Sequence, residues 1–367
     1  MIKLAFNARF TTPAFLGDAE QHGQWRTPPF KALLRQCWRI AYSASTRHAV
    51  DVERMRIDEA QLFGAAADTE SASGLSLVRL RLDRWTPGKT SLPAGREQKK
   101  IAHPVNNNPI DPLVYLGYGR VEQAPATIPA IPPEQPAVLR LGILDDHPHF
   151  IPQQRDTLFH AVGLMREFGA LGGRSRNGYG SLWLEPTDET TTGLLSIDDE
   201  VYRDWRECLS VNWPHALGRD EHGPLVWQTV KPTGEWQDAL RELARRRVAL
   251  NATLKLEIGE VTTPSERHLV GYPRGAVKGK PNSVRSWKDS NRRDLRLPNS
   301  LRLKVVPDPD QASRLHGRIV HIPCAPTEAF QGATRERLEA VWTKVHRVLD
   351  EDPGLQRVDR LGGGLKP

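Results

Sequence analysis

Hydrophobic and polar residues alternate over residues 2–10, so that every second side chain falls on one face of an extended chain. This period of two predicts a half-buried β-strand. Over residues 30–41 the apolar positions recur every three or four residues instead, behind Thr27 and two prolines that suit the first turn of a helix. The same reasoning predicts a helix at 158–168 and strands at 75–82, 138–144 and 179–184.

The predicted order is strand, helix, strand, strand, helix, strand. This is the order of a ferredoxin-like fold, in which two helices cover one face of a four-stranded antiparallel sheet. The rest of the chain repeats the plan less completely, with helices at 236–248 and 334–349 and strands at 225–230, 301–306 and 318–322. We therefore predict an α+β protein with two ferredoxin-like (RRM-like) domains.

Two domains also fit the length of 367 residues, which exceeds the usual size of one. The acidic, threonine-rich stretch after residue 187 is the expected boundary, which gives an N-terminal domain over 1–187 and a C-terminal domain over 188–367. Each domain is expected to carry a long irregular insertion. The first spans 84–136 and ends in a proline-rich tether, and the second is a basic loop over 264–300.

Positive charge is in excess, because 51 Lys and Arg against 44 Asp and Glu give a net charge of +7. Such an excess favours polyanionic partners, since binding them releases condensed counterions. The excess is largest between residues 274 and 304, where ten Lys or Arg accompany only two acidic residues. A nucleic acid is the expected partner of this segment, although a solvated loop carries the same signature.

The cysteines and the apolar segments bear on where the protein works. Three cysteines without C-x-x-C spacing argue against a zinc ribbon or a disulfide framework and fit a reducing compartment. The sequence does not open on a signal-like apolar segment, and no apolar run is long enough to span a bilayer. We therefore expect a cytoplasmic protein without a membrane partner.

Residues 171–182 combine four glycines with two arginines, between a predicted helix and a predicted strand. Glycine lets a backbone approach a ligand closely, and arginine brings forked donors that suit phosphate. The position after a helix fits neither the dinucleotide-binding motif nor the P-loop, so we expect the loop to hold a phosphate backbone. The alternative is a helix cap with solvated arginines. The expected contacts are Gly172, Gly173, Arg174, Ser175, Arg176, Asn177, Gly178, Tyr179 and Gly180.

A second basic feature lies on the first predicted helix. Lys31, Arg35 and Arg39 follow one another at intervals of four residues, which places them in one stripe beside the apolar face. Like charges arranged in this way repel one another. An anionic partner is therefore expected, either RNA or DNA, or an acidic side chain elsewhere in the fold.

Candidates for catalysis or metal binding are few. Residues Asp145–His149 offer four potential ligands in five positions (Asp145, Asp146, His147 and His149), but no second carboxylate cluster completes a two-metal site. His22, in a polar loop before the first helix, is the best placed histidine for general acid–base cleavage of RNA, yet nothing else completes that chemistry. We expect no metal, no cofactor and no catalytic residue, and we interpret the His22 loop as a binding or subunit-contact element.

Several segments together resemble the CRISPR RAMP superfamily, and within it the family of the first subunit of the type III-B Cmr effector complex. Residues 12–20 resemble the family's strand end and Gly-Gly-Asp-like loop, and residues 25–39 resemble its basic first helix. Leu62–Gly64 is similar to its Phe-Gly element, and residues 172–181 to its glycine-rich loop. Asn291–Arg293 is similar to an arginine element of its second domain.

The resemblance implies two ferredoxin-like domains and a non-catalytic RNA-binding subunit near the 3′ end of the guide RNA. The implied partners are CRISPR guide RNA, target RNA and other type III effector subunits. Three alternatives stay open: a metal-independent RAMP endoribonuclease that processes guide RNA, a backbone RAMP subunit of another type III complex, and a scaffold that bridges proteins only. Outside the glycine-rich loop, the expected RNA contacts are Arg26, Lys31, Arg35, Arg39, Lys278, Lys280, Arg285, Arg292 and Arg293.

Overall fold

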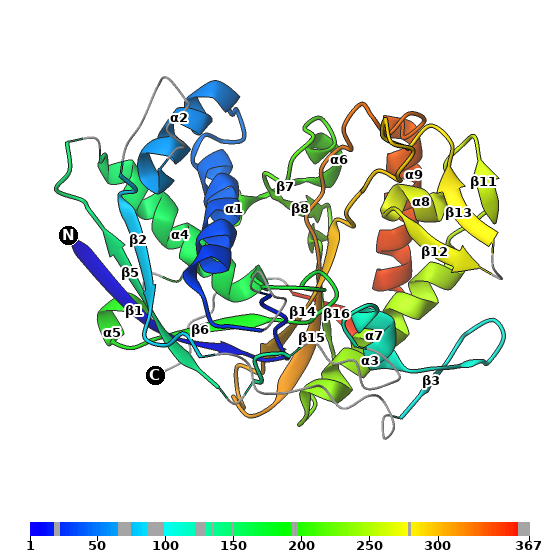
Figure 1. The fold of residues 1–367 in the computed structure, drawn as a ribbon, viewed down its shortest axis with the longest axis horizontal. Coiled ribbons are helices and arrows are strands. Elements are labelled where there is room, and N and C mark those ends of the chain that lie inside the picture. The colour runs from blue at the N-terminus through cyan, green and yellow to red at the C-terminus, as the bar shows by residue number, and fades with distance from the viewer. Residues whose placement is uncertain are drawn as a thin grey trace.

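Two four-stranded antiparallel sheets, each covered by helices, dominate the computed structural model of this chain (Figure 1). The α+β class predicted from the sequence is therefore confirmed. We call the part from β1 to β6 the first half, on the left in Figure 1, and the part from β10 to β16 the second half. The structure describes residues 1–17, 23–64, 75–86, 99–121, 129–133, 135–148, 150–192, 195, 197–277 and 280–358.

The first half has the predicted order of elements, with two additional helices and two short strands among them. Its sheet order is β2-β5-β1-β6, and α1 and α4 pack side by side. Alternation in β1 buries Leu4, Phe6, Ala8 and Phe10 in the core that these helices share. The elements are β1 (Ile2–Phe10), α1 (Thr27–Ser45), α2 (Val52–Phe63), β2 (Val78–Leu82), β5 (Ala137–Ile143), α4 (Pro152–Phe168) and β6 (Leu182–Pro186).

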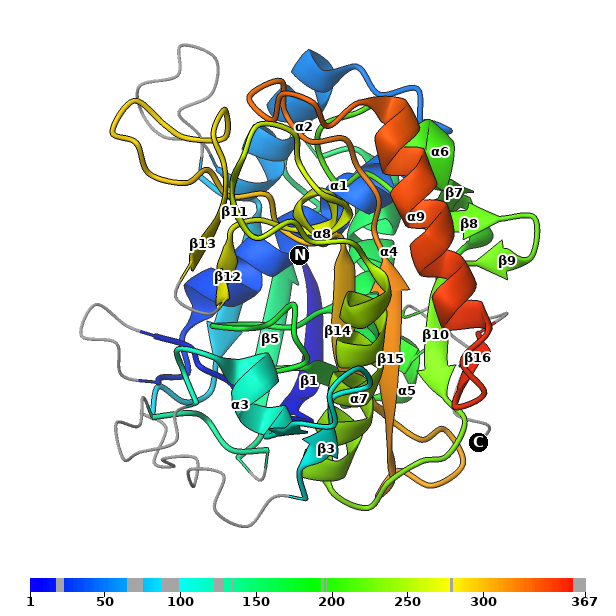
Figure 2. The same ribbon diagram turned by 90° about the vertical axis from the view of Figure 1, so that its right-hand side faces the viewer.

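The second half repeats this order. Its sheet order is β14-β15-β10-β16, which matches that of the first sheet when the strands are counted along the chain. Figure 2 shows α7 and α9 in front of this sheet, on the side away from α1 and α4. The elements are β10 (Val226–Thr229), α7 (Trp236–Thr253), β14 (Leu301–Pro307), β15 (Leu315–His321), α9 (Arg335–Asp350) and β16 (Leu355–Arg357).

Some predicted boundaries are wrong. Leu75 lies outside β2 and is 85% exposed. The strand predicted from Tyr179 begins at Leu182, because Gly178 and Gly180 have φ of +91° and +62° and interrupt the extended conformation. Strand β15 begins three residues before its predicted start, because it pairs with the whole length of β14.

The two predicted insertions contain regular structure where they are described. Within 84–136 the chain forms β3 (Ile101–Ala102), β4 (Pro109–Ile110) and α3 (Pro112–Gly117), and α3 packs against α7. The basic loop predicted at 264–300 contains α8 (Glu266–Val270), β12 (Arg274–Val277) and β13 (Lys280–Val284). Glycine and proline hid these strands in the sequence, and pairing of β13 with β11 (Gly259–Val261) supplies their backbone partners. Between the halves lie α5 (Glu189–Thr192), a 3-10 turn (Asp199–Val201), β7 (Tyr202–Asp204), α6 (Trp205–Cys208), β8 (Leu217–Asp220) and β9 (Gly223–Pro224).

Strand β14 joins the two halves. Its apolar side chains enter the core with α7 and α9, while Lys304 donates a hydrogen bond to the carbonyl of Arg166 near the end of α4. On the neighbouring strand, Arg318 forms an ion pair with Glu167 at 2.7 Å, and these side chains are only 9% and 7% exposed. Buried charges are costly unless they stay paired. This contact therefore fixes one half against the other.

Candidate nucleic-acid interface

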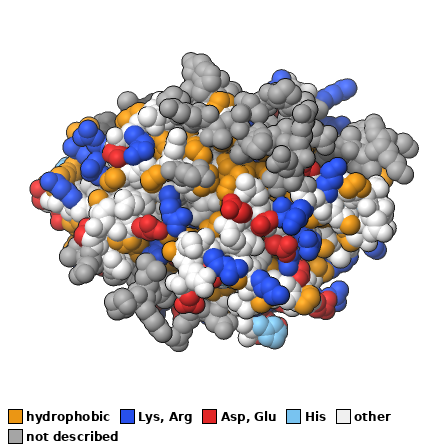
Figure 3. Space-filling view, turned by 90° about the horizontal axis from the view of Figure 1, so that it is seen from below, with side chains coloured by type: hydrophobic (Ala, Val, Ile, Leu, Met, Phe, Trp, Pro, Cys, Tyr) orange, Lys and Arg blue, Asp and Glu red, His pale blue; other side chains and the backbone are white. Residues whose placement is uncertain are grey.

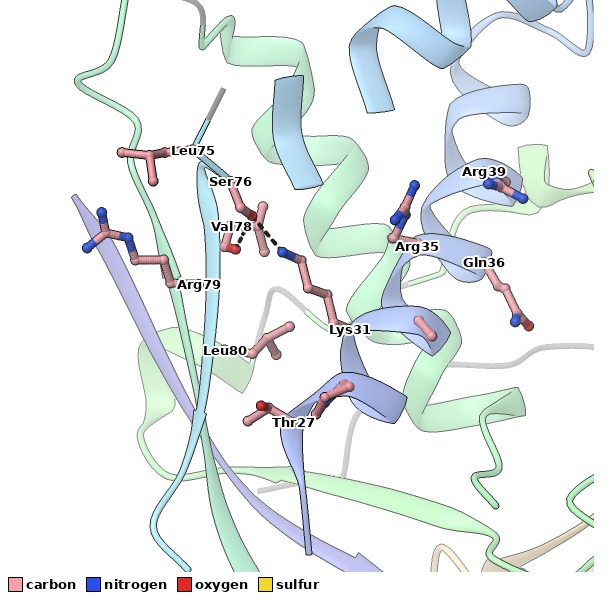
Figure 4. Close-up of a pocket in the computed structure, with 12 residues that line it drawn as sticks. Thr27, Lys31, Arg35, Gln36, Arg39, Leu75, Ser76, Val78, Arg79 and Leu80 are labelled. Atoms are coloured by element: carbon pink, nitrogen blue, oxygen red, sulfur yellow. Dashed lines mark hydrogen bonds between the residues drawn. The ribbon is translucent and has the colours of Figure 1, made fainter. Parts of the chain in front are cut away.

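The basic stripe on α1 is partly neutralised by the fold. Arg35 Nε donates to Glu59 Oε1 at 2.7 Å, and Arg39 Nε donates to Glu59 Oε2 at 2.8 Å. Glu59, from α2, is only 4% exposed; burial alone would raise its pKa, but the hydrogen bonds and charges of Arg39 and Arg35 outweigh burial and lower it. Lys31 Nζ donates to the Ser76 hydroxyl at 2.9 Å (Figure 4). The acidic-partner alternative is thus correct for Arg35 and Arg39, yet one carboxylate leaves two positive charges of the stripe unbalanced.

The stripe opens onto a groove between α1 and β2, which we call the α1–β2 groove. Its cavity is about 960 Å³, and Lys31, Arg35, Gln36 and Arg39 line it from α1 (Figure 4). Arg79 extends from β2 away from α1. None of the described residues that line the groove is acidic. An anion in this groove would therefore meet cations and polar groups, while the Glu59 carboxylate is already paired with Arg35 and Arg39.

The glycines of the 171–182 loop allow backbone to approach backbone. Gly172 has φ of +90°, and a β-carbon there would lie 2.5 Å from the Phe15 carbonyl oxygen. A β-carbon on Gly180 would lie 1.9 Å from the Leu171 carbonyl oxygen. The Gly173 N–H donates to Phe15 at 2.9 Å. These glycines therefore hold the loop against the chain after β1, whereas the sequence predicted that they approach a phosphate.

Other loop residues also have structural partners. Helix α4 ends at Phe168 with Gly169 as its C-cap, so the cap predicted at Gly172 and Gly173 is misplaced. Asn177 Nδ2 donates to the Leu116 carbonyl at 2.9 Å. Tyr179 is fully buried and donates a hydrogen bond to the Leu113 carbonyl at 3.0 Å. An RNA strand bound on the surface therefore does not contact it.

The two arginines of the loop point to different places. Arg174, with φ of +60°, lies beside Gly119 and Arg120, near the exposed ring of Tyr118. Its pKa is lowered first by burial and then by the charge of Arg120. Arg176 lies toward the second half and lines three cavities there. The sequence predicted one surface for both arginines, and the structure separates them.

Arg176 meets Arg302, from β14, where the two halves join. Both side chains line each of three cavities of about 240, 250 and 260 Å³. Burial, and then the charge of Arg176, lowers the pKa of Arg302 to about 10, so Arg302 stays charged at neutral pH. Within the described ranges, neither guanidinium has an acidic or hydrogen-bonding partner. Two like charges held together in this way favour an anion beside them.

The cavities at the junction continue from the α1–β2 groove. Gln36 lines the groove and the cavities of about 240 and 250 Å³. Arg39 lines the groove and the cavity of about 240 Å³. No acidic residue is among the described residues that line these four cavities. The face seen in Figure 3, by contrast, mixes Lys and Arg with Asp and Glu. We call five of the cations along the cavities the basic track: Lys31, Arg35, Arg39, Arg176 and Arg302. Arg79 and Arg296 also line the cavities but are not counted in it.

Sequence reasoning missed Arg302. It falls within the basic stretch of residues 274–304, but nothing in its neighbourhood along the chain distinguishes it from the other cations there. Its position depends on the pairing of β14 with β15 and on the contact of Leu303 N–H with the Arg176 carbonyl at 2.9 Å. Only the fold brings these two arginines together.

Among the other predicted contacts, Gly172 and Ser175 line the cavity of about 250 Å³, and the rest lie off the track. Arg26 is the N-cap residue of α1, and its Nε is buried without a partner in the described part of the chain. Arg285 is 70% exposed beside Glu260, at 3.7 Å. Arg292 and Arg293 are exposed in a turn before β14. Lys278 and the side chain of Lys280 lie outside what the structure describes.

The candidate catalytic and metal residues do not form a site in the described part of the chain. His22 and His149 lie outside it. Asp145 forms an ion pair with the N-terminal amine at 2.7 Å. Among the residues that are described, no group of three or more His, Cys, Asp or Glu side chains is placed to hold a metal ion.

The fold and the site define a class of protein: two halves of matching sheet order that meet beside basic cavities, with no acidic residue among the described lining of those cavities. Cmr1 from Pyrococcus furiosus, in its apo form, is a similar solved structure, with 14% identity over 88% of each chain and a TM-score of 0.44. A chain of the type III-B Cmr-beta complex, bound to cognate target RNA and AMPPnP in the presence of single-stranded DNA, is 13% identical over 93% of this chain and 99% of its own, with a TM-score of 0.48. A chain of Cmr-beta bound to cognate target RNA is 11% identical over 94% of this chain and 99% of its own, with a TM-score of 0.44.

These structures carry the name of the complex that the sequence segments resemble. Neither the family models nor the curated proteins gave a match. Among the helices that are described, none is both long enough and apolar enough to cross a membrane. At such low identity, the roles of individual residues follow only from the geometry of this chain.

Proposed function

We propose that this chain is an RNA-binding subunit of a type III CRISPR effector complex, related to the first subunit of the type III-B Cmr complex. The observation that carries the proposal is the basic track, whose five cations line joined cavities without an acidic residue among their described lining. The sequence segments that resemble the RAMP superfamily supply the kind of complex. The proposed partners are guide RNA, target RNA and the other subunits of the effector.

The track suits the backbone of a single RNA strand. Guanidinium groups bind phosphate through paired donors, and a row of cations can bind successive phosphates without reading the bases. In RNA-guided complexes base pairing supplies the sequence specificity. The proposed role is therefore to hold the backbone of an RNA strand, while base pairing with a second strand reads its sequence.

The repeated sheet order supports the proposal at the level of the fold. We assign one ferredoxin-like domain to residues 1–187 and another to 188–367, because each has the strand–helix–strand–strand–helix–strand order of that fold. The track then begins on the first helix of the first domain and ends where β14 of the second domain meets the glycine-rich loop. The close backbone contacts of that loop hold Arg176 in place beside β14.

Binding of the purified full-length protein to single-stranded RNA tests the proposal. Each phosphate contact on a single strand contributes about 0.7 to the slope of log affinity against log salt, so four or five contacts predict a slope of about −3. RNA of the same length with neutral methylphosphonate linkages is the control, and we expect it to bind at least about tenfold more weakly. Equal binding of the two oligonucleotides, or a slope near zero, would contradict the proposal.

Assembly requires a separate test. We expect RNA and other type III subunits to co-purify with the protein from its native cells. Recovery of the protein without either would contradict the proposed role in an effector complex. Cleavage of guide precursor by the purified protein without divalent metal would support the endoribonuclease alternative instead.

A further inference from the structure

A pocket of about 260 Å³ in the second half opens beside the track, and we call it the side pocket. Arg176 and Arg302 line it and also line the two adjoining cavities, so they mark the place where the side pocket joins the track. The volume equals that of about nine molecules of liquid water, which leaves room for one flat ring system but not for a stack of them. The side pocket therefore lies to one side of the track, which we assign to the phosphates of the RNA.

The walls of the side pocket are mostly apolar. Val270 from α8, Ile322 after β15, and Phe330 and Trp342 from the region of α9 all contribute to the lining. Aromatic and aliphatic walls of this kind bind the faces of nucleobases, since every base has an apolar π-face. No acidic residue is among the described residues of the lining.

One polar group in the wall lacks a partner among the described residues. Asn299 Oδ1 accepts a hydrogen bond from the Leu301 N–H at 2.7 Å, but its Nδ2 is buried and no described residue offers it an acceptor. An unpaired buried donor costs free energy, but this atom is closed to solvent, so an acceptor on a ligand pairs with it only if the amide turns toward the pocket. The edges of all four RNA bases carry such acceptors. The pocket thus combines apolar walls with two amide side chains, Asn212 and Asn299, and three guanidinium groups, of which Arg176 and Arg302 also line the track.

We propose that the side pocket receives one unpaired base of the bound RNA strand while Arg176 and Arg302 hold the phosphate of that nucleotide. This inference rests on the proposed function. It adds one site at which a particular nucleotide of the strand is held at a fixed position on the protein. A free mononucleotide shares the same chemistry. The strand is the favoured source because the cations continue beyond the two arginines, through Arg39 to Lys31, where a mononucleotide has no further phosphates to bind.

A scan with abasic sites tests the inference on the full-length protein. Single-stranded RNAs that each lack one base are compared with the intact strand for binding to the wild type and to Ala325→Phe. Ala325 lines the side pocket, and a phenyl ring there fills it without removing a cation. We expect one position at which loss of the base weakens binding to the wild type about tenfold, and no such position for Ala325→Phe.

Two further variants keep the result interpretable. Ala325→Leu fills less of the pocket and should show the same loss to a smaller extent if the phenyl variant does not fold. Ala329→Phe adds the same ring at an exposed position of the same segment, outside the lining, and should behave as the wild type does. Melting curves establish that each variant is folded.

The outcomes separate the inference from the proposed function. If the wild type binds RNA with the expected salt slope but the abasic scan is flat, the base pocket is wrong and the track stands. If the wild type binds neither intact nor abasic RNA, both are wrong. If uridine, cytidine, adenosine or guanosine monophosphate binds as tightly as the strand and is blocked by Ala325→Phe, the occupant is a free nucleotide and the inference is overturned.

Discussion

The two ends of the basic track differ in how their charge is balanced. On α1, Arg35 and Arg39 share the buried carboxylate of Glu59, and their side chains are 39% and 40% exposed. At the junction of the halves, Arg176 and Arg302 have no acidic partner within the described ranges. The stripe of cations on α1, which is evident from the sequence, is thus partly neutralised. Arg176 and Arg302, which lie far apart in the sequence, keep charges that no described acidic side chain balances.

The difference shows that the density of Lys and Arg along a chain is a poor measure of charge available to a ligand. Glu59 lies on α2, a different helix from Arg35 and Arg39, whose charge it partly cancels. Arg302 lies on β14, far along the chain from Arg176, whose charge it reinforces. Net charge attracts a polyanion from a distance, but the unbalanced pairs decide where it is held.

Breaking the contact between the halves should have the largest effect. Glu167→Gln removes the acidic partner of buried Arg318, and we expect a loss of about 3 kcal/mol in the free energy of unfolding. Denaturant unfolding measures the loss. Glu185→Gln, which breaks a more exposed pair with Arg9 at 3.3 Å, is the control and should cost under about 1 kcal/mol. Equal losses for the two variants would mean that the junction does not depend on its buried ion pair.

Removal of the free arginines should weaken RNA binding more than removal of cations from α1. Arg176→Ala with Arg302→Ala should lower affinity for single-stranded RNA about 100-fold and the salt slope by about 1.4. Lys31→Ala with Arg39→Ala removes the same charge but should cost only about tenfold, because Arg39 already gives donors to Glu59.

Titrations over a range of salt concentrations measure both values. Arg155→Ala, an exposed arginine on α4 that pairs with its neighbour Asp156, is the charge control and should leave affinity nearly unchanged. A larger loss from the α1 pair than from the junction pair would reverse the contrast.

Freeing the α1 arginines should act in the opposite direction. Glu59→Gln restores one unbalanced positive charge, so we expect RNA affinity to rise about threefold and the salt slope to steepen by about 0.7. It should also cost about 2 kcal/mol of stability, because two arginines lose a buried carboxylate. A fall in affinity would show that Glu59 positions these arginines for RNA instead of competing with it.

The pH dependence of stability distinguishes the same variant. Because the folded-state pKa of Glu59 is lowered from about 4.5, its stabilising contribution is complete above pH 4.5 and is lost as the pH falls through the lower, folded-state pKa. Glu59→Gln cannot take up that proton, so its stability should fall less steeply with acid over this range. Parallel curves for the two proteins would contradict the ion-pair assignment.

The smallest effect is expected within the glycine-rich loop itself. Arg174→Ala removes the same side chain as Arg176→Ala, two residues away, but on the side of Gly119 and Arg120. We expect less than about a threefold change in RNA affinity, against about tenfold for Arg176→Ala. Equal effects of the two substitutions would mean that Arg174 and Arg176 belong to one RNA-binding surface, as the sequence predicted.

The sequence predicts the long periodic elements well. Strand β1 and helices α1, α4, α7 and α9 lie where their apolar spacing places them, because each buries one face in a core. Short elements were missed: β16 has three residues, and β12 and β13 lie in a segment of glycine, proline and lysine whose pairing depends on β11. Local pattern does not encode such pairing.

The candidate site was predictable only in part. The stripe Lys31, Arg35 and Arg39 follows from helical spacing alone, and its position beside the buried face of α1 is confirmed. The partnership of two of these with Glu59 depends on how α2 packs, and the meeting of Arg176 with Arg302 depends on how two sheets join. Both are consequences of tertiary structure, which residue spacing does not carry.

Crosslinking tests the central claim most directly. Single-stranded RNA with 4-thiouridine at successive positions would be irradiated with the full-length protein, and the attached peptides identified by mass spectrometry. We predict crosslinks to residues 171–182 and 296–304, the two segments that bring Arg176 and Arg302 together, with further crosslinks to α1. Crosslinks confined to residues 280–293, with none at the junction, would contradict the account.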